Sequence, residues 1–575
     1  MPELSMFPPA QCKFLCGPKK GLPHARFAYG ITYMSAADRN HNGRYCTVNR
    51  HTFLHGALVL MIAGLVTRVM GFIYRIFLTR IIGAEGMGLF QIVFPILGLV
   101  LTFVTMGFPL AISKLVAEAV AQRDRARIQR IMRISGISVA SLAVLFTLLM
   151  YLFRHAIETH WLTDPRAYPA YLAMIPVVGI IAISSLYRGY FQGLQDMAPT
   201  AWASILEQTV RILSIWILAA YFVRYSLSYA AAAAMMGMVL GELSGLLFMV
   251  FQQRRRARLV DVIPDPAYTR ATESMRSTVH AIGQISLPVT LSKLIWSLLF
   301  AAEPVLVMRA LQAAGFVTSQ ATSMYGEYSG MAIPLLVFPT VITSSLATNL
   351  VPAVSEAAAA GEMFRIRKRL SQSFTATALV SFPASVVFTL FAGPLTTVIY
   401  KQPNIGPILA IMAPFEFLLC LQAPLTGILQ GLNRAGVAMV NSIVGGVAKL
   451  LLIVVLARRP EVGILGVSMA TAFSFTLSTL LNLWFVVRMI GFHIRLQSLL
   501  RVGIAAIGMF AYMQAITFHH RPLPGSTLLL AIGGGLIVYF ALLCALRVLT
   551  SRAVSRIPKV GPALARIVRW MPFAV

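Results

Sequence analysis

Nine ionisable side chains lie inside segments of the chain that are otherwise apolar. They are Arg68, Arg75, Glu207, Arg211, Glu242, Lys293, Glu303, Glu416 and Lys449. Guanidinium and ammonium groups bind phosphate and other anions through charge-assisted hydrogen bonds. Carboxylates in an apolar setting pair with such cations, or carry a proton or a cation themselves. The residue types therefore predict a buried polar site with more basic than acidic groups, suited to an anionic ligand.

The spacing of these residues favours an enclosed site over a lipid-facing one. Each ionisable group at the centre of a membrane helix costs about 2.5–3.5 kcal/mol, so nine facing lipid would cost on the order of 25 kcal/mol. We therefore expect them to face each other, water or a ligand. Gly64, Arg68, Gly71 and Arg75 recur at helical spacing and form one stripe on the first apolar segment.

Structural interpretations compete with binding at several of these positions. Glu207 and Arg211 are four residues apart, so they either form an ion pair that holds helices together or contribute to the site. Arg75 lies near the end of its segment, where a long basic side chain can anchor at the membrane interface. Glu242 lies between two glycines and favours helix packing, whereas Glu416 is a candidate cation or proton site.

Other kinds of chemistry find little support in the sequence. The histidines His155, His160 and His280 are too scattered for a metal site. Cys12 and Cys16 have no second pair of ligands at metal spacing, so we expect them to be free cytosolic thiols. The chain lacks a phosphate-binding loop of the nucleotide-hydrolase type, and the gaps between apolar segments are too short for a large catalytic domain. We expect no enzyme activity, no cofactor and no metal.

The composition excludes an ordinary soluble domain. Of the 575 residues, 58% are apolar and 12% charged, whereas soluble domains are about a quarter charged. The mean hydropathy is +0.77. The net charge of +29 would suggest a nucleic-acid partner in a soluble protein, but the basic residues gather in alternate gaps between apolar segments. The sequence therefore predicts an all-α polytopic membrane protein without a nucleic-acid partner.

We expect about fourteen transmembrane helices, because each apolar segment has about the 20 residues that a crossing needs. The segments are 56–79, 87–109, 134–153, 167–187, 200–222, 229–251, 281–303, 326–350, 372–392, 407–430, 437–457, 463–487, 497–517 and 525–546. Basic residues are concentrated in the gaps after the second, sixth and eighth segments and in the tail, so both termini are predicted to be cytoplasmic. The Gly-rich stretch 83–88 is expected to be a short external turn.

Two motifs recur at nearly one offset and indicate an internal duplication. Gly86-Met87-x5-Val93-Phe94-Pro95 returns 244 residues later, and Phe191-Gln192-Gly193-Leu194 returns 238 residues later with one substitution. At the second offset Arg211 falls on Lys449. Six segments separate the equivalents, so the halves share one orientation, as in transporters with parallel repeats.

We therefore predict two six-helix lobes, 53–252 and 281–490, joined by a basic cytoplasmic linker at 253–280. Two further helices follow at 491–547. A disordered arm at 1–52, whose start codon is open to question, and a basic tail at 548–575 complete the chain.

Several longer stretches resemble the stage V sporulation protein B family. They are Gly64-Leu-Val-Thr-Arg-Val-Met-Gly-Phe-Ile-Tyr-Arg75, Ile82-Gly-Ala-Glu-Gly-Met-Gly-Leu-Phe-Gln91, Gly107-Phe-Pro-Leu-Ala-Ile-Ser-Lys-Leu-Val-Ala-Glu118, Tyr187-Arg-Gly-Tyr-Phe-Gln-Gly193, Val351-Pro-Ala-Val-Ser-Glu356 and Gly427-x-x-Gln-Gly-Leu-Asn433. The resemblance covers about residues 55–515. It implies the fold of the multidrug, oligosaccharidyl-lipid and polysaccharide exporters, in which two six-helix lobes enclose a cavity.

The resemblance also implies a function, namely flipping of a polyprenyl-pyrophosphate-linked oligosaccharide such as a peptidoglycan precursor, as in spore cortex synthesis. Lipid II flippases use arginines of the first helix, and Arg68 matches the first of them. Arg75 lies one residue beyond the position of the second, and the segment 326–350 has no counterpart of their further arginine. A multidrug or cation antiporter of the same fold and a non-transporting membrane scaffold for envelope synthesis are the alternatives.

On this interpretation the substrate-binding residues are Arg68, Arg75, Arg211, Lys293 and Lys449, and Glu207, Glu303 and Glu416 are ion-coupling or structural residues. Lys449 has a glycine where Arg211 has Glu207, so we expect Lys449 to be the freer cation. The expected partners are a lipid-linked sugar pyrophosphate and the bilayer of the cell membrane, with cell-wall synthesis enzymes as further candidates.

Overall fold

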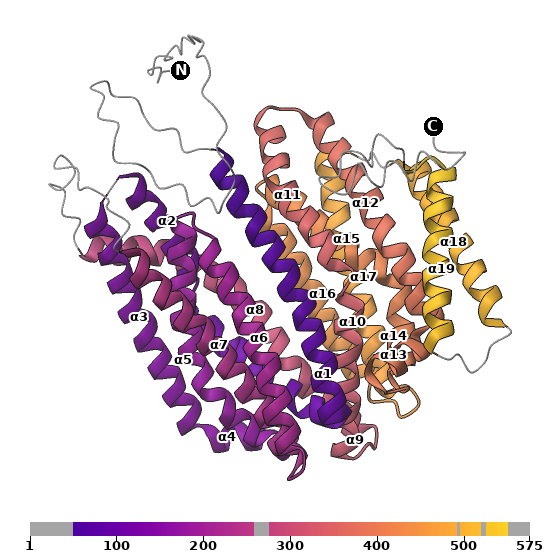
Figure 1. The fold of residues 1–575 in the computed structure, drawn as a ribbon, viewed down its shortest axis with the longest axis horizontal. Coiled ribbons are helices and arrows are strands. Elements are labelled where there is room, and N and C mark those ends of the chain that lie inside the picture. Colours follow the sequence, from indigo (N-terminus) through magenta and orange to yellow (C-terminus); the bar gives the residue numbers. More distant parts are fainter. Residues whose placement is uncertain (1–49, 123, 258–274, 492–494, 519–524, 550–575) are drawn as a thin grey trace, which may run out of the picture. The chain divides into compact units, whose positions relative to one another are not determined.

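The apolar segments form helices throughout the computed structural model. The structure describes residues 50–122, 124–257, 275–491, 495–518 and 525–549 (Figure 1). The predicted arm 1–52, the linker 253–280 and the tail 548–575 lie largely outside these ranges. Within them every regular element is a helix, which agrees with the predicted fold class.

The amino-terminal half, residues 50–257, contains seven α-helices and one short 3₁₀ helix. They are α1 (Arg50–Thr105), α2 (Phe108–Ala121), α3 (Arg125–Leu152), α4 (Arg154–His160), η1 (Pro165–Ala167), α5 (Tyr168–Gly193), α6 (Ala198–Phe222) and α7 (Leu227–Ala257). Helix α7 packs closely on α5 and on α6, and all three contact α1.

The carboxy-terminal half is described over residues 275–491, 495–518 and 525–549, and its helices are interrupted more often than those of the first half. Its elements are α8 (Met275–Ala313), α9 (Thr318–Tyr325), the π-helix η2 (Gly326–Ala332), α10 (Ile333–Val337), α11 (Thr340–Ala359), α12 (Met363–Leu390), α13 (Ala392–Tyr400), α14 (Ile405–Met412), the 3₁₀ helix η3 (Ala413–Phe415), α15 (Glu416–Gly431), α16 (Ala435–Leu456), α17 (Gly463–Ile490), α18 (Leu496–Phe518) and α19 (Gly525–Ala545). Helices α18 and α19 pair with each other and pack on α12.

Twelve helices among the described residues are long and apolar enough to cross a membrane, or thirteen when the bent pair Thr318–Val337 and Thr340–Ala359 counts as one span. The first of the twelve, Ile62–Ala121, covers 60 residues and includes most of α1 together with α2. At about 1.5 Å per residue this is roughly three times the thickness of the hydrocarbon core. The two segments predicted at 56–79 and 87–109 lie within it, on either side of Gly83.

The predicted external turn at 83–88 is wrong in its extent. Helical geometry continues through these residues except at Gly83, whose φ of 69° and ψ of −172° are open only to glycine. One residue with left-handed φ is enough to redirect α1. The longer run of glycines has a different role, which is close packing.

Helix α1 contacts both halves of the chain and lies between them in Figure 1. Near Gly83 the contact is tight. A Cβ atom on Gly88 would lie 2.0 Å from the Thr322 carbonyl oxygen of α9, and one on Gly326 would lie 2.1 Å from the Ala84 carbonyl oxygen. The Thr322 hydroxyl also donates a 2.7 Å hydrogen bond to the buried carboxylate of Asp164. The two halves are therefore joined at this end by backbone packing and a buried hydrogen bond.

Candidate functional site

A cavity of about 600 Å³ lies between α1 and the broken span formed by η2, α10 and α11, with α6 and α7 also contributing to its wall. This main, central cavity is called the arginine cavity below. Arg68, Arg75 and Arg211 all line it. The helical spacing of the two α1 arginines places both on the face that lines the cavity, as the sequence predicts. The structure therefore brings together three of the five predicted substrate-binding residues.

Arg68 and Arg75 carry positive charge that no carboxylate balances within the described part of the chain. Arg68 donates a 2.6 Å hydrogen bond to the Ser344 hydroxyl of α11 and forms no ion pair there. Arg75 is half-buried beside Tyr74 and Tyr400, and has neither a hydrogen bond nor an ion pair to a described residue. Because such cations are costly in a membrane protein, these two guanidinium groups form the part of the cavity most suited to an anion.

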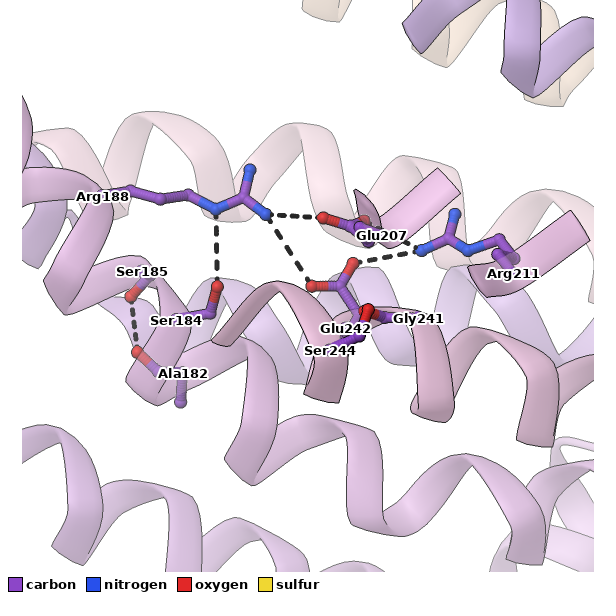
Figure 2. A network of polar contacts seen from close by, with 9 residues as sticks. All are labelled: Ala182, Ser184, Ser185, Arg188, Glu207, Arg211, Gly241, Glu242 and Ser244. Atoms are coloured by element: carbon purple, nitrogen blue, oxygen red, sulfur yellow. Dashed lines mark hydrogen bonds and ion pairs between the residues drawn. The ribbon is translucent and has the colours of Figure 1, made fainter. Parts of the chain in front are cut away.

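Arg211 differs because it belongs to a balanced network of two arginines and two glutamates (Figure 2). Its Nη2 atom lies 3.1 Å from both Glu207 Oε1 and Glu242 Oε1. Arg188 of α5 contacts the other sides of the two carboxylates, at 2.8 Å from Glu207 and 3.9 Å from Glu242. The formal charges sum to zero, so the network ties α5, α6 and α7 together, and little of the Arg211 charge is left for a ligand.

Close packing makes this network possible. A Cβ atom on Gly241 would lie 2.8 Å from the Glu207 carbonyl oxygen, so the glycine lets α7 approach α6. The predicted packing role of the segment around Glu242 is thus correct, but Glu242 itself also supplies a carboxylate to both arginines. Sequence reasoning missed Arg188, because it falls one residue beyond the predicted segment 167–187, although it lies within one of the family-like motifs.

Lys449 is not the unpaired cation that the sequence suggests. Its Nζ atom lies 2.6 Å from Glu303 Oε1, with both side chains largely buried. Tyr328 of η2 donates to the same carboxylate at 3.2 Å. The expectation failed because it considered only the residue one turn away on the same helix, whereas the partner comes from α8. Lys449 lines a smaller cavity of about 240 Å³, which shares Phe300, Ser329 and Ile333 with the main one.

The two remaining predicted residues lie apart from the arginine cavity. Lys293 is exposed and lines another cavity of about 580 Å³ between α1, α8 and α16, which shares only Phe300 with the main one. Glu416 is fully buried at the start of α15, where one carboxylate oxygen accepts a 3.2 Å hydrogen bond from the Cys420 thiol. Its other oxygen has no partner among the described residues. The sequence therefore identified the arginines of the main cavity but grouped them with cations that lie elsewhere.

Comparisons with known proteins identify the family. The polysaccharide biosynthesis protein family model matches residues 53–358, and the MatE family model matches residues 304–455. Stage V sporulation protein B of Bacillus subtilis is 36% identical over 90% of this chain and 100% of its own length. Lipid II flippase MurJ of the same organism is 26% identical over 77% of this chain and 84% of its own length.

A solved structure shares the fold. The chain superimposes on the inward closed conformation of lipid II flippase MurJ with a TM-score of 0.62, 13% identity, and coverage of 84% of this chain and 98% of that one. At this identity the superposition shows the fold alone. Together with the matches in sequence over most of the chain, it places the helices described above in a known class of membrane transporter. The chain is a multi-pass membrane protein that belongs to the stage V sporulation protein B family of MATE-like membrane transporters.

Proposed function

We propose that this protein flips a polyprenyl-pyrophosphate-linked oligosaccharide, such as a peptidoglycan precursor for the cell wall or spore cortex, by alternating access. One observation carries the proposal: Arg68 and Arg75 line the central cavity without a carboxylate partner among the described residues. Two guanidinium groups, two helical turns apart on the same face of α1, match the charge of a pyrophosphate and its multiple acceptor oxygens. The similarity to a lipid II flippase supports the same class of substrate.

The charges of the cavity argue against the alternative of a multidrug or cation antiporter. The acids Glu207 and Glu242 contact both network arginines, and Glu303 contacts Lys449. A cationic substrate would therefore meet uncompensated positive charge at Arg68 and Arg75. A scaffold without transport would leave these two charges without a role.

We further propose that both termini lie in the cytoplasm, that two six-helix lobes, 53–252 and 281–490, surround the cavity, and that the membrane potential sets the direction of transport. Two negative charges that leave a cell with a negative interior gain about 2.3 kcal/mol each per 100 mV, or roughly 4.6 kcal/mol together. The membrane potential therefore suffices as a driving force. A reporter fused after Val575 should be active only in the cytoplasm, and activity outside would contradict the topology.

The function can be tested with the purified protein in liposomes and a fluorescent polyprenyl-pyrophosphate disaccharide. The wild type should move the lipid between leaflets, and Arg68→Gln should slow movement at limiting substrate by about tenfold or more, because a charge-assisted hydrogen bond is worth about 1.5–3 kcal/mol. Arg224→Gln is the matched control, since Arg224 is exposed between α6 and α7 and lines none of the cavities described above. Equal rates in wild type and Arg68→Gln, or export of a cationic dye in place of the lipid, would contradict the proposal.

A further inference from the structure

A second, larger cavity of about 830 Å³ adjoins the arginine cavity and has a different character. Val337, Thr340 and Ser344 line both, so the two spaces meet along α10 and α11. The second cavity extends from there between α11, α15 and α16. None of its lining residues carries a charge. Its volume lies within the range of about 300–1,000 Å³ that is typical of small-molecule sites.

Two stripes of uncharged polar side chains line this cavity. On α11 the stripe is Thr340, Ser344 and Thr348, and on α15 it is Gln422, Thr426 and Gln430. Each stripe has a spacing of four residues, which puts its members on one face of the helix. The side-chain amides of Gln422 and Gln430 would lack hydrogen-bond partners against lipid, and the hydroxyl stripe borders the same cavity as these amides. We therefore expect both to face the interior of the transporter.

The two helices are held together so that both stripes border the same space. A Cβ atom on Gly427 of α15 would lie 2.9 Å from the Ala347 carbonyl oxygen of α11. One turn further on, a Cβ atom on Gly431 would lie 2.8 Å from the Val351 carbonyl oxygen. Ala347, Val351 and Gly427 line the cavity as well. Glycine packing thus fixes the spacing between the amide stripe and the hydroxyl stripe.

The stripes offer complementary hydrogen-bonding groups. The hydroxyls of Thr340, Ser344 and Thr348 donate to backbone carbonyls of their own segment, so their oxygens are left to accept. The amides of Gln422 and Gln430 form no hydrogen bond to any other described residue, so each keeps two donors and an acceptor for a ligand. Trp296 of α8, 54% exposed, adds an aromatic surface.

We infer that this neutral cavity is the subsite for the sugar portion of the substrate, and that it takes an uncharged saccharide whose pyrophosphate lies at Arg68 and Arg75. Sugar hydroxyls both donate and accept, which matches amides facing hydroxyl oxygens, and the apolar face of a pyranose packs on an indole ring. Ser344 marks the boundary, because it accepts from Arg68 and also belongs to the hydroxyl stripe. The inference rests on the proposed function and adds a specificity element to it.

The test compares two ligands on the purified full-length protein: a polyprenyl-pyrophosphate disaccharide and the same polyprenyl pyrophosphate without sugar. The double variant Gln422→Leu/Gln430→Leu should weaken binding of the disaccharide lipid about tenfold and leave binding of the sugar-free lipid unchanged. Arg68→Gln should weaken binding of both. Asn349→Leu is the matched control for an amide-to-leucine change, because Asn349 is exposed on α11 and lines neither cavity.

The outcomes separate the subsite from the function on which it rests. Equal loss of both ligands in the double variant, or no loss of either while melting is unchanged, would overturn the subsite and leave the proposed function intact. Failure of the wild type to bind either lipid would overturn both. A double variant that fails to fold would be replaced by Thr426→Val, which removes one hydroxyl from the same stripe and should give the same selectivity for the sugar-bearing lipid with a smaller loss.

Discussion

At the scale of single residues, the important distinction is between cations that have a carboxylate partner and cations that do not. Arg211 and Lys449 are paired with acids from neighbouring helices, whereas Arg68 and Arg75 are not paired within the described ranges. A residue of either kind looks the same in the sequence. Substitution should nevertheless affect different properties. Loss of a paired cation leaves an uncompensated carboxylate behind and lowers stability, whereas loss of an unpaired cation leaves none.

Arg68→Gln should therefore impair binding without lowering stability, whereas Arg211→Gln should lower stability. Removal of Arg211 leaves two carboxylates facing Arg188 alone, and loss of one partner of a buried pair costs about 3 kcal/mol or more. Thermal unfolding in detergent would measure both effects. The double variant Arg211→Gln/Glu242→Gln restores the charge balance and should recover most of the loss. Equal melting temperatures for Arg68→Gln and Arg211→Gln would contradict this assignment.

At the scale of elements, α1 has two functions that are separated along its length. Its first half carries Arg68 and Arg75, which line the cavity, and the segment after Gly83 packs on α9 and η2 at the junction of the two halves. The glycines at this junction allow backbone to approach backbone without intervening side chains. A transporter that alternates between two states needs such a contact to form and to separate.

Gly326→Ala should weaken this junction, because the added methyl group would lie 2.1 Å from the Ala84 carbonyl oxygen and 2.5 Å from the Gly88 nitrogen. A weaker junction should open the cavity to reagents from the side of the membrane on which Gly83 lies. A cysteine introduced at Ser329, which lines the cavity, should therefore react severalfold faster with a membrane-impermeant thiol reagent added on that side in the variant than in the protein with Gly326. Gly64→Ala is the control, since a methyl group there meets no atom within 4 Å. Unchanged reactivity in a folded Gly326→Ala variant would show that this junction does not control access to the cavity.

The buried hydrogen bond between Thr322 and Asp164 predicts the pH dependence of the same junction. Burial tends to raise the pKa of Asp164, but hydrogen bonds from Arg166 and Thr322 outweigh it and hold the pKa below its usual range. A depressed pKa means that the stabilisation is fully present above the unfolded value of about 4 and is lost as the pH falls through the folded value. Melting should thus show no effect of this group between pH 8 and 5 and a loss only below about pH 4. Asp164→Asn should remove that acid dependence, and persistence of the full dependence in the variant would exclude Asp164 as its cause.

At the scale of the whole molecule, periodicity and composition were sufficient to predict an all-helical polytopic protein. Segment lengths follow from the thickness of the bilayer, so the spans could be located from hydropathy alone. The interruptions were predictable only in part: the bend after Val337 falls at Pro339, which the sequence shows, whereas the π-helix at 326–332 packs against α1 and has no signal in its own segment. The predicted duplication is compatible with the shared helical architecture of the two halves.

The site was predictable only in part, for a physical reason. A stripe of arginines on one helix is visible in the sequence, because it depends on spacing along one element. Pairing between helices is not, so Glu303 could not be matched to Lys449, nor Arg188 to Glu207 and Glu242. The neutral polar stripes give no comparable signal, because a hydroxyl in a membrane helix can bond to the backbone of its own helix and so carries none of the cost that marks a buried charge.

The central claim is that Arg68 and Arg75 bind the pyrophosphate through charge that no acid compensates. The most direct measurement compares the affinity of the purified protein for a polyprenyl pyrophosphate and for the corresponding neutral polyprenol. The wild type should prefer the pyrophosphate by about 100-fold or more, from two charge-assisted contacts of about 1.5–3 kcal/mol each. In Arg68→Gln/Arg75→Gln this preference should nearly disappear while melting stays unchanged. A preference that survives in the double variant would contradict the account.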